Sequence, residues 1–209
     1  MIKDILTREN LDVWDDFLLF HKFALDEMNT KITILNEEFQ LIHSYNPIEH
    51  IKSRIKTPES IMDKLIRKGY EISLENARDH IYDVAGIRII TSFTSDIYNL
   101  SKLICNIKDI RVIQIKDYIK EPKSNGYRSL HLLLEVPIYL SDRIEYLKLE
   151  VQLRTIAMDF WASLEHKIYY KFDKTVPSYL TEQLKDCAEL ANFLDEKMLS
   201  INDEIKKYK

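Results

Sequence analysis

The chain has 209 residues, which is enough for one hydrophobic core with helical extensions but short for two separate cores. Hydrophobic residues make up 45% and charged residues 31%, which is typical of a soluble globular protein and leaves little room for long disordered segments. The net charge of -4 argues against nucleic acid as a general partner, so any anion site must be a local cluster of basic side chains.

The first predicted element is a long amphipathic helix over residues 10–43, where apolar side chains recur at helical spacing. Asn46 and Pro47 end this helix, because a residue that precedes proline disfavours helical backbone angles. Residues 51–56 alternate with a period of two, which predicts a short strand with one basic face. A second helix is predicted from Pro58, and Gly69 is well placed to end it.

Four further strands are predicted in the middle of the chain, where apolar residues alternate over modest lengths. They cover residues 84–93, 110–119, 129–136 and 145–154. A helix over residues 95–107 separates the first two of these strands. In the last strand, the alternation from Leu147 predicts an apolar face on the core and a polar face, from Lys148 to Arg154, in water.

After Thr155 the sequence returns to helical periodicity until the segment 173–177 interrupts it. A final amphipathic helix is predicted over residues 178–207, with an apolar stripe along its length. Such a stripe is suited to self-association, and packing within one chain explains it equally well. The sequence leaves both possibilities open.

Two cysteines, Cys105 and Cys187, are widely separated and lack the spacing of metal ligands, so we expect reduced thiols that pack inside the protein. The N-terminus is polar within a few residues and lacks the apolar region of a signal peptide. No run approaches the roughly 18 apolar residues of a membrane span. We therefore expect a cytoplasmic protein without a membrane partner.

A polar loop over residues 121–131 combines basic, amide and aromatic side chains and leads directly into a predicted strand. Gly126 gives this loop conformational freedom beside Tyr127, whose ring could stack on a base. Lys123 and Arg128 could hold phosphate groups. A plain hairpin loop whose tyrosine packs on its own strand explains the pattern equally well.

Two carboxylates stand at chemically suggestive places, Asp83 before the first central strand and Glu150 on the polar face of the last one. Carboxylates from two strands suit Mg²⁺, which completes its ligand set with water and substrate phosphate oxygens. The chain has 34 acidic residues, however, and their spacing does not show that this pair meets. Several basic side chains are similarly open to a plain interpretation as solvated charges: Arg54, Lys56, Lys64, Arg67 and Arg88.

Three ordered segments together resemble the synthetase motifs of the RelA/SpoT family. These segments are Tyr82-Asp-Val-Ala-Gly-Ile-Arg-Ile89, Pro122-Lys-Ser-Asn-Gly-Tyr-Arg-Ser-Leu-His131 and Glu150-Val-Gln-Leu-Arg-Thr155. Flanking residues 46–50, 53–56 and 157–166 extend the similarity to the single-domain small alarmone synthetases of the RelP and RelQ type. The resemblance covers nearly the whole chain, and the fit is closer to the RelP type.

This resemblance implies a nucleotidyltransferase-like α+β fold, in which long terminal helices flank a mixed sheet of about five strands. It implies one synthetase domain over residues 1–209, with a catalytic core at about 46–172 between helices at about 10–43 and 178–207. The implied activity moves the β,γ-pyrophosphate of ATP to the 3′-hydroxyl of GDP or GTP, which yields an alarmone and AMP. Small members of the family form tetramers and synthesise without degrading, and we expect the same here.

The resemblance also assigns roles to single residues. Asp83 and Glu150 would hold Mg²⁺, and Glu150 would take the proton from the guanosine 3′-hydroxyl. Arg54 and Arg88 would enclose the adenine ring between guanidinium planes. The ATP phosphates would be bound by Lys56, Ser60, Lys64, Arg67 and Lys116. Tyr127 would stack on guanine, and the rest of the acceptor site would comprise Lys123, Asn125 and His131.

Two other functions remain to be weighed. An enzyme that transfers nucleotides or pyrophosphate to an RNA end would share the fold, but the chain lacks a Gly-Ser motif followed by an Asp-x-Asp pair. A catalytically inactive nucleotide-binding regulator would be expected to lack Asp83 or Glu150, and both are present. The RelQ type has an activating alarmone cleft, but His50 stands where we would expect its aromatic contact, which argues against such activation.

Overall fold

The computed structural model describes residues 8–170 and 177–208, and its centre is a five-stranded sheet in the order β1-β2-β5-β4-β3. The strands are β1 (Ile48–Ile55), β2 (Ala85–Thr91), β3 (Arg111–Asp117), β4 (Leu130–Tyr139) and β5 (Ile144–Thr155). Strands β2 and β5 run parallel, and every other neighbouring pair is antiparallel. The sheet is therefore mixed, as predicted, and β1 and β3 form its two edges.

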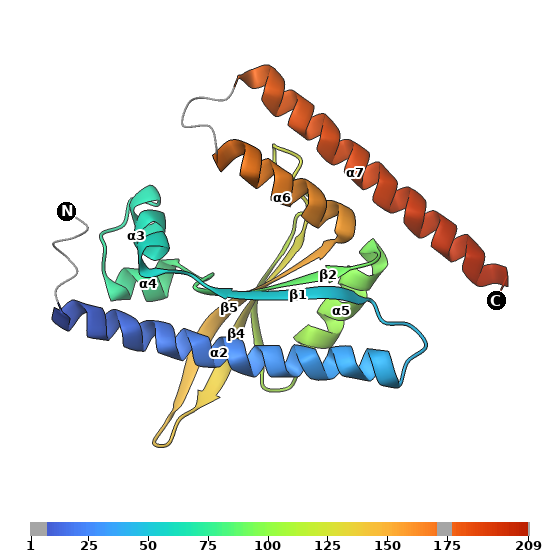
Figure 1. The fold of residues 1–209 in the computed structure, drawn as a ribbon. Helices are drawn as coiled ribbons and strands as arrows, with labels where there is room; N and C mark the ends of the chain where they lie inside the picture. Colours follow the sequence, from blue (N-terminus) through green and yellow to red (C-terminus); the bar gives the residue numbers. More distant parts are fainter. Residues whose placement is uncertain (1–7, 171–176, 209) are drawn as a thin grey trace.

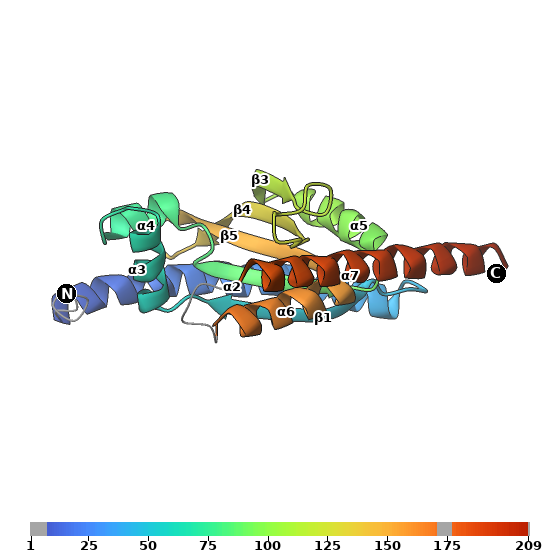
Figure 2. The same cartoon turned by 90° about the horizontal axis from the view of Figure 1, so that it is seen from above.

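Helices cover both sides of this sheet. They are α2 (Arg8–Leu41), α3 (Pro58–Arg67), α4 (Leu74–His80), α5 (Thr94–Cys105), α6 (Ile156–Tyr170) and α7 (Ser178–Ile205), followed by a 3₁₀ turn (Lys206–Tyr208). In Figure 1, α2 passes below β1 and β2, whereas α6 and α7 lie above the sheet. Figure 2 shows α6 and α7 side by side. The arrangement agrees with the predicted α+β fold with long helices near both termini.

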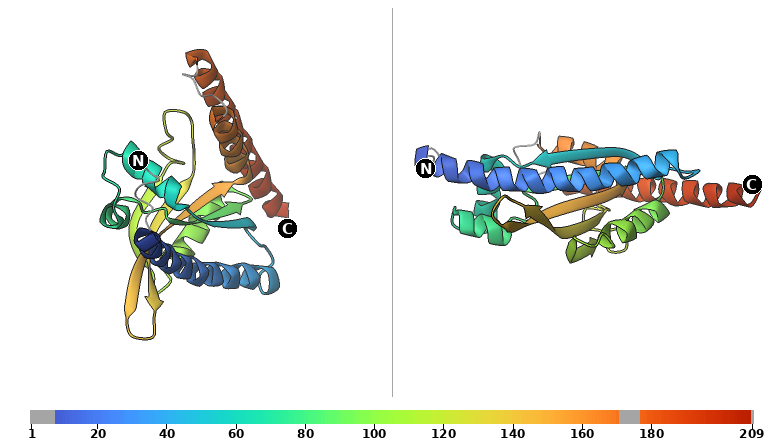
Figure 3. Two further views of the ribbon diagram at one scale, coloured as in Figure 1. Left: turned by 60° about the vertical axis from the view of Figure 1, so that its left-hand side comes forward. Right: turned by 90° about the horizontal axis from the view of Figure 1, so that it is seen from below.

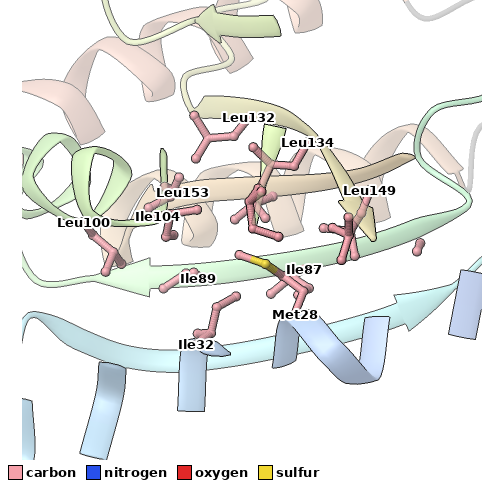
Figure 4. Packing of buried hydrophobic residues seen from close by; sticks show 14 of the residues in the cluster. Met28, Ile32, Ile87, Ile89, Leu100, Ile104, Leu132, Leu134, Leu149 and Leu153 are labelled. Carbon is pink, nitrogen blue, oxygen red and sulfur yellow. The ribbon is translucent and has the colours of Figure 1, made fainter. Parts of the chain in front are cut away.

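The main hydrophobic core lies on the α2 side of the sheet. Figure 4 shows Met28 and Ile32 of α2 facing Ile87 and Ile89 of β2, and all four side chains are almost fully buried. Burial of side chains of this size contributes about 1.5–3 kcal/mol each. Because alternate residues of a strand point to opposite faces, this packing turns Gly86, Arg88 and Glu150 to the other face of the sheet.

A smaller core attaches α3 and α4 to the N-terminal half of α2, where Trp14 and Phe17 pack against residues of both short helices. Thr57 caps α3 by accepting a hydrogen bond from the amide of Ser60 at 3.3 Å. Gly69 ends the helix at a φ of 78°, as its predicted role requires, and its amide donates to the carbonyl of Ile66 at 2.9 Å. These two ends fix α3 beside the start of β2.

Some elements differ from the sequence prediction. Strand β1 begins at Ile48, because the side-chain oxygen of Asn46 accepts the Ile48 amide at 2.9 Å and turns the chain into the sheet early. Helix α4 was not predicted, since its seven residues are too few to show a helical repeat. Cys105 is half-buried, but Cys187 is exposed, so the expectation that both thiols pack inside is wrong for Cys187.

The C-terminal part of α7 projects past the sheet, at the opposite end of the molecule from the start of α2, as Figure 3 shows. The predicted apolar stripe of this helix remains largely uncovered, with Leu190 67% and Leu194 55% exposed. Packing within one chain therefore does not account for the stripe. In the part of the chain that the structure describes, no helix is both long and apolar enough to span a membrane.

Candidate active site

The polar face of the sheet carries a pocket of about 190 Å³ where β1, β2 and β5 meet. Its lining comprises Lys52, Ser53, Arg54, Asp83, Gly86, Ile87, Arg88, Glu150 and Gln152. Gly86 lies directly opposite Glu150 in the parallel pairing of β2 with β5, and Asp83 stands just before β2. The structure thus brings Asp83 and Glu150 into one pocket, a meeting that their separation in sequence did not reveal.

Asp83 is held by two lysines from different elements. Lys56, just after β1, donates to its Oδ2 at 2.5 Å, and Lys64 of α3 donates to its Oδ1 at 2.7 Å. Burial alone would raise the pKa of Asp83, but the hydrogen bonds from the two lysines outweigh burial and lower this pKa to about 2. The carboxylate is therefore ionised at neutral pH and lies among cations.

Glu150 is oriented by two uncharged or weakly basic neighbours. Nδ1 of His131 lies 3.1 Å from its Oε1, and the amide of Gln152 donates to its Oε2 at 2.7 Å. Burial raises the pKa of Glu150, whereas the hydrogen bonds from His131 and Gln152 lower it, and the net direction is downward. Glu150 is thus an ionised, half-buried carboxylate with a fixed orientation.

The two carboxylates fit the chemistry of a magnesium site. No group of three or more His, Cys, Asp or Glu side chains among the described residues could hold a metal. Mg²⁺ needs no such group, because it binds through one or two carboxylates and takes phosphate oxygens and water as further ligands. Gly86 has no side chain to fill the space beside Glu150, and both Asp83 and Glu150 are ionised.

The two arginines of the pocket come from neighbouring strands. Arg54 of β1 pairs with Gly86 of β2, which makes Arg88 its diagonal neighbour on the same face. Side chains in diagonal positions start about 7–8 Å apart, which is roughly twice the contact distance between stacked atoms. Both side chains therefore leave the same face of the sheet with space between them, and both line the pocket.

The remaining residues predicted to bind ATP phosphates fall into two places. Ser60, Lys64 and Arg67 share one face of α3, since they are spaced by four and three residues. Lys116 lies apart from them on the edge strand β3, opposite His131 of β4. Four strand spacings of about 4.8 Å separate β3 from β1. The structure thus places Lys116 on the side of the predicted acceptor residues.

The predicted acceptor loop is packed against the two C-terminal helices. The ring of Tyr127 rests in a cluster with Trp161 of α6 and Ala188 of α7. It also meets the ring of His131, on the strand that follows its own loop, edge-on at 6.0 Å between centroids. The side-chain amide of Asn125 donates to Glu165 of α6 at 3.2 Å. Gly126 has a φ of 87°, and a Cβ atom added there would lie 2.6 Å from the Cβ of Ala188.

Cations surround the ring of Tyr127. Nζ of Lys123 lies 4.8 Å from its centroid and 4.7 Å from that of Tyr118, and the guanidinium carbon of Arg154 lies 5.1 Å from the Tyr127 centroid. Ammonium and guanidinium groups at such distances are attracted to the face of an aromatic ring. A base that stacks on Tyr127 would therefore exchange places with one of these cations.

Sequence reasoning missed two charged residues beside the polar face of the sheet, Arg154 and Asp159. Arg154 was expected in water at the end of the polar face of β5, yet it is only 5% exposed. It pairs with Asp159 of α6 at 2.9 Å, and Arg88 also contacts Asp159, at 3.2 Å. Arg154 lies within a predicted strand next to apolar Leu153, as Arg54 lies next to Ile55, and an arginine beside an apolar strand neighbour is a signal that could have marked it.

A pocket with two ionised carboxylates, two arginines and a lysine-bearing helix beside it suits an enzyme that transfers phosphate groups, because such groups hold metal ions and stabilise phosphate charge. Residues 53–175 match the family described as "Region found in RelA / SpoT proteins". The chain belongs to this family, which confirms the resemblance seen in its motifs. It is 56% identical over 195 residues to the GTP pyrophosphokinase YwaC of Bacillus subtilis, which covers 93% of each protein.

Solved structures of small alarmone synthetases share this fold. Small alarmone synthetase 2 from Bacillus subtilis has a TM-score of 0.83 at 54% identity, over 91% of this chain and 98% of that one. Small alarmone synthetase 1 from the same organism, solved bound to its product pppGpp, has a TM-score of 0.85 at 33% identity, over 92% and 97% of the two chains.

Proposed function

We propose that the protein is a GTP/GDP pyrophosphokinase, which transfers the β,γ-pyrophosphate of ATP to the 3′-hydroxyl of GDP or GTP. The observation that carries this proposal is the shared pocket, where ionised Asp83 and Glu150 lie between Arg54, Arg88 and the lysines at Asp83. Membership of the RelA/SpoT family and the name of the 56% identical relative support the same activity.

Arg54 and Arg88 would bind the adenine ring of the donor. Lys56 and Lys64 both donate hydrogen bonds to the Asp83 carboxylate. When Asp83 binds a metal in place of these lysines, their ammonium groups would become free to bind the donor phosphates. Mg²⁺, held by Asp83 and Glu150, would neutralise charge on the phosphate oxygens of ATP. Ser60 and Arg67 lie on the same face of α3 and extend this cationic surface.

Glu150 would act as the base for the acceptor. The proton of the 3′-hydroxyl passes to its carboxylate, the 3′-oxygen forms a bond to the β-phosphorus of ATP, and the bond between that phosphorus and the α,β-bridging oxygen breaks. AMP leaves with the electron pair of the broken bond. Since little else changes, catalysis rests on positioning the reactants and on stabilising negative charge.

The acceptor would bind over the loop that carries Tyr127. Its guanine ring would stack on Tyr127 in place of Lys123, whose ammonium group then becomes free to bind the phosphates of GDP or GTP. Asn125 and His131 border the same space. Lys116, which lies opposite His131, would contact phosphates from this side of the sheet.

A labelling experiment tests this function. The protein is incubated with γ-labelled ATP, Mg²⁺ and either GMP, GDP or GTP, and a parallel reaction contains an RNA oligonucleotide. Label on a guanosine tetra- or pentaphosphate, with AMP as the second product, is the expected result. Label on the RNA alone would favour the alternative function at an RNA end, and the absence of any turnover would favour an inactive regulator.

The uncovered stripe on α7 supports a homotetramer as the working assembly. Phe160 of α6 is 66% exposed and continues the apolar surface formed by Leu190 and Leu194. Apolar patches of this kind on a soluble protein usually mark contact surfaces. Leu190→Glu should reduce the mass measured by light scattering to that of a smaller assembly.

We further propose a cytoplasmic location, where ATP and guanine nucleotides are available.

A further inference from the structure

A partly buried group of charges, in which Arg154 is the most deeply buried, lies between the polar face of the sheet and α6. Asp159, in the first turn of α6, accepts hydrogen bonds on its Oδ1 from Arg88 at 3.2 Å and from Arg154 at 2.9 Å. One carboxylate oxygen is thus shared by two guanidinium groups from different strands. The Nε atoms of both arginines are buried without a hydrogen-bond partner in the part of the chain that the structure describes.

This arrangement is poor for stability. A buried charge is costly unless it is paired and fully hydrogen-bonded, and here two cations share one anion. Burial and the charge of Arg154 lower the pKa of Arg88, which reflects the same crowding. Native proteins keep few buried polar groups without a partner, so the two Nε atoms call for an explanation, and a functional role is one such explanation.

Arg154 also starts a hydrogen-bond chain that ends at Glu150. Its Nη2 donates to the hydroxyl of Tyr127 at 2.8 Å, and that hydroxyl lies 2.9 Å from Nε2 of His131. Nδ1 of His131 lies 3.1 Å from Glu150. Ser129 donates to the same hydroxyl at 2.9 Å.

The donors of this chain have one consistent direction. The Tyr127 oxygen accepts two hydrogen bonds, from Arg154 and Ser129, so its single proton is directed to Nε2 of His131. A neutral imidazole that accepts at Nε2 carries its proton on Nδ1, which therefore donates to Glu150. Each donor thus points from the buried cation towards the carboxylate, and hydrogen bonds in such a series strengthen one another.

We propose that Arg154 and Asp159 are positioning residues that connect the donor and acceptor subsites. Asp159 fixes Arg88 for the donor base, and Arg154 fixes Tyr127 for the acceptor base and, through His131, the orientation of Glu150. This inference rests on the proposed function for the identity of the two nucleotides. The connection itself stands on the hydrogen bonds among residues of β2, β4, β5, α6 and the acceptor loop.

A double-mutant cycle tests the connection. Tyr127→Phe keeps the ring and removes the hydroxyl, whereas Arg154→Lys keeps the charge beside Asp159 and loses the second, fork-like contact to Tyr127. Each variant should lower kcat/KM for GDP about tenfold, the usual value of one hydrogen bond to a charged group. The kcat/KM for GDP of the double variant should be at most about twofold lower than that of the less active single variant, because both changes break the same link. The KM for ATP should stay unchanged in all three.

Asp159→Asn separates the two arms of the proposal. It should raise the KM for ATP as well as the KM for GDP, each about tenfold, since Arg88 and Arg154 both lose their shared carboxylate. Tyr146→Phe and Arg111→Lys are matched controls on exposed side chains away from the site, and they should leave all constants unchanged. Thermal unfolding of each variant tests whether the protein remains folded.

The same variants are then compared by calorimetric titration of GDP in the presence of a non-cleavable α,β-methylene analogue of ATP. Non-additive losses in GDP affinity support the connection even if wild-type protein releases no AMP, a result that would overturn only the proposed function. Independent, additive losses in an active enzyme would overturn the connection alone. Lower unfolding temperatures with unchanged KM values would show that Arg154 and Asp159 have only a structural role, and this result would also overturn the connection. A wild-type protein that binds neither nucleotide would overturn both.

Discussion

Gly126→Ala is the sharpest perturbation of the acceptor loop, because two separate effects of the added methyl group can be measured apart. The residue has a φ of 87°, which costs about 1–2 kcal/mol for an L-residue with a side chain. The new Cβ would also lie 2.6 Å from the Cβ of Ala188. Atoms in contact need about 3.5–4.0 Å, so the loop and α7 must separate by about 1 Å.

Gly69→Ala is the matched control. Gly69 has a similar φ of 78°, but a Cβ there would meet nothing within 4 Å. It should therefore lose about 1–2 kcal/mol of unfolding free energy and keep its kinetic constants for the acceptor. Gly126→Ala should show the same loss of stability and also lower kcat/KM for GDP about 10- to 100-fold, since misplacement by about 1 Å costs up to that factor.

Rescue by a second substitution completes the test. Ala188→Gly removes the methyl group that the new Cβ meets, at a cost of about 0.5–1 kcal/mol in helix stability. In the double variant, kcat/KM for GDP should return to within a fewfold of wild type, although the backbone penalty remains. Steady-state kinetics and chemical denaturation measure the two quantities. A double variant as slow as Gly126→Ala itself would show that contact with α7 does not position the loop.

Three further predictions concern the carboxylates, the metal and the pH dependence of stability. Glu150→Gln should leave the unfolding temperature nearly unchanged and reduce kcat about 10²- to 10⁴-fold; near-normal turnover would remove Glu150 from the mechanism. Chelation of divalent cations with EDTA should abolish label transfer and excess Mg²⁺ should restore it, whereas activity in EDTA would exclude the proposed metal. His21 is buried, and burial lowers its pKa below 6.5 in the folded state. The unfolded chain therefore takes up the proton first as pH falls below about 6.5, so denaturation should show stability lost between pH 7.5 and 5.5 in wild type but not in His21→Gln.

Periodicity predicted most of the fold because most elements are long enough to repeat their pattern. Strand β5, with Leu149, Val151 and Leu153 on its buried face, is a clear example. Helix α4 was missed because seven residues hold fewer than two full repeats. Cys187 was expected inside because it lacks the spacing of a metal ligand and is far from Cys105, but spacing in sequence does not report burial, and Cys187 lies on the exposed side of α7.

The site was predicted less completely than the fold, since its geometry depends on pairs of strands that are distant in sequence. The parallel pairing of β2 with β5 brings Gly86 beside Glu150, and no local pattern indicates that pairing. The position of Lys116 across the sheet from α3 follows from strand order alone. Arg154 is buried beside its partner Asp159, and Asp159 lies close to it because α6 follows β5 directly.

Phosphorus NMR of the product formed from ATP and GDP tests pyrophosphate transfer to the 3′-hydroxyl, because it shows which phosphorus was attacked and where the new group is attached. The expected product carries a diphosphate whose inner phosphorus couples to the ribose 3′-proton, and it forms together with an equal amount of AMP. A single phosphate on the acceptor with ADP as the second product, or a longer chain at the 5′ position, would contradict it.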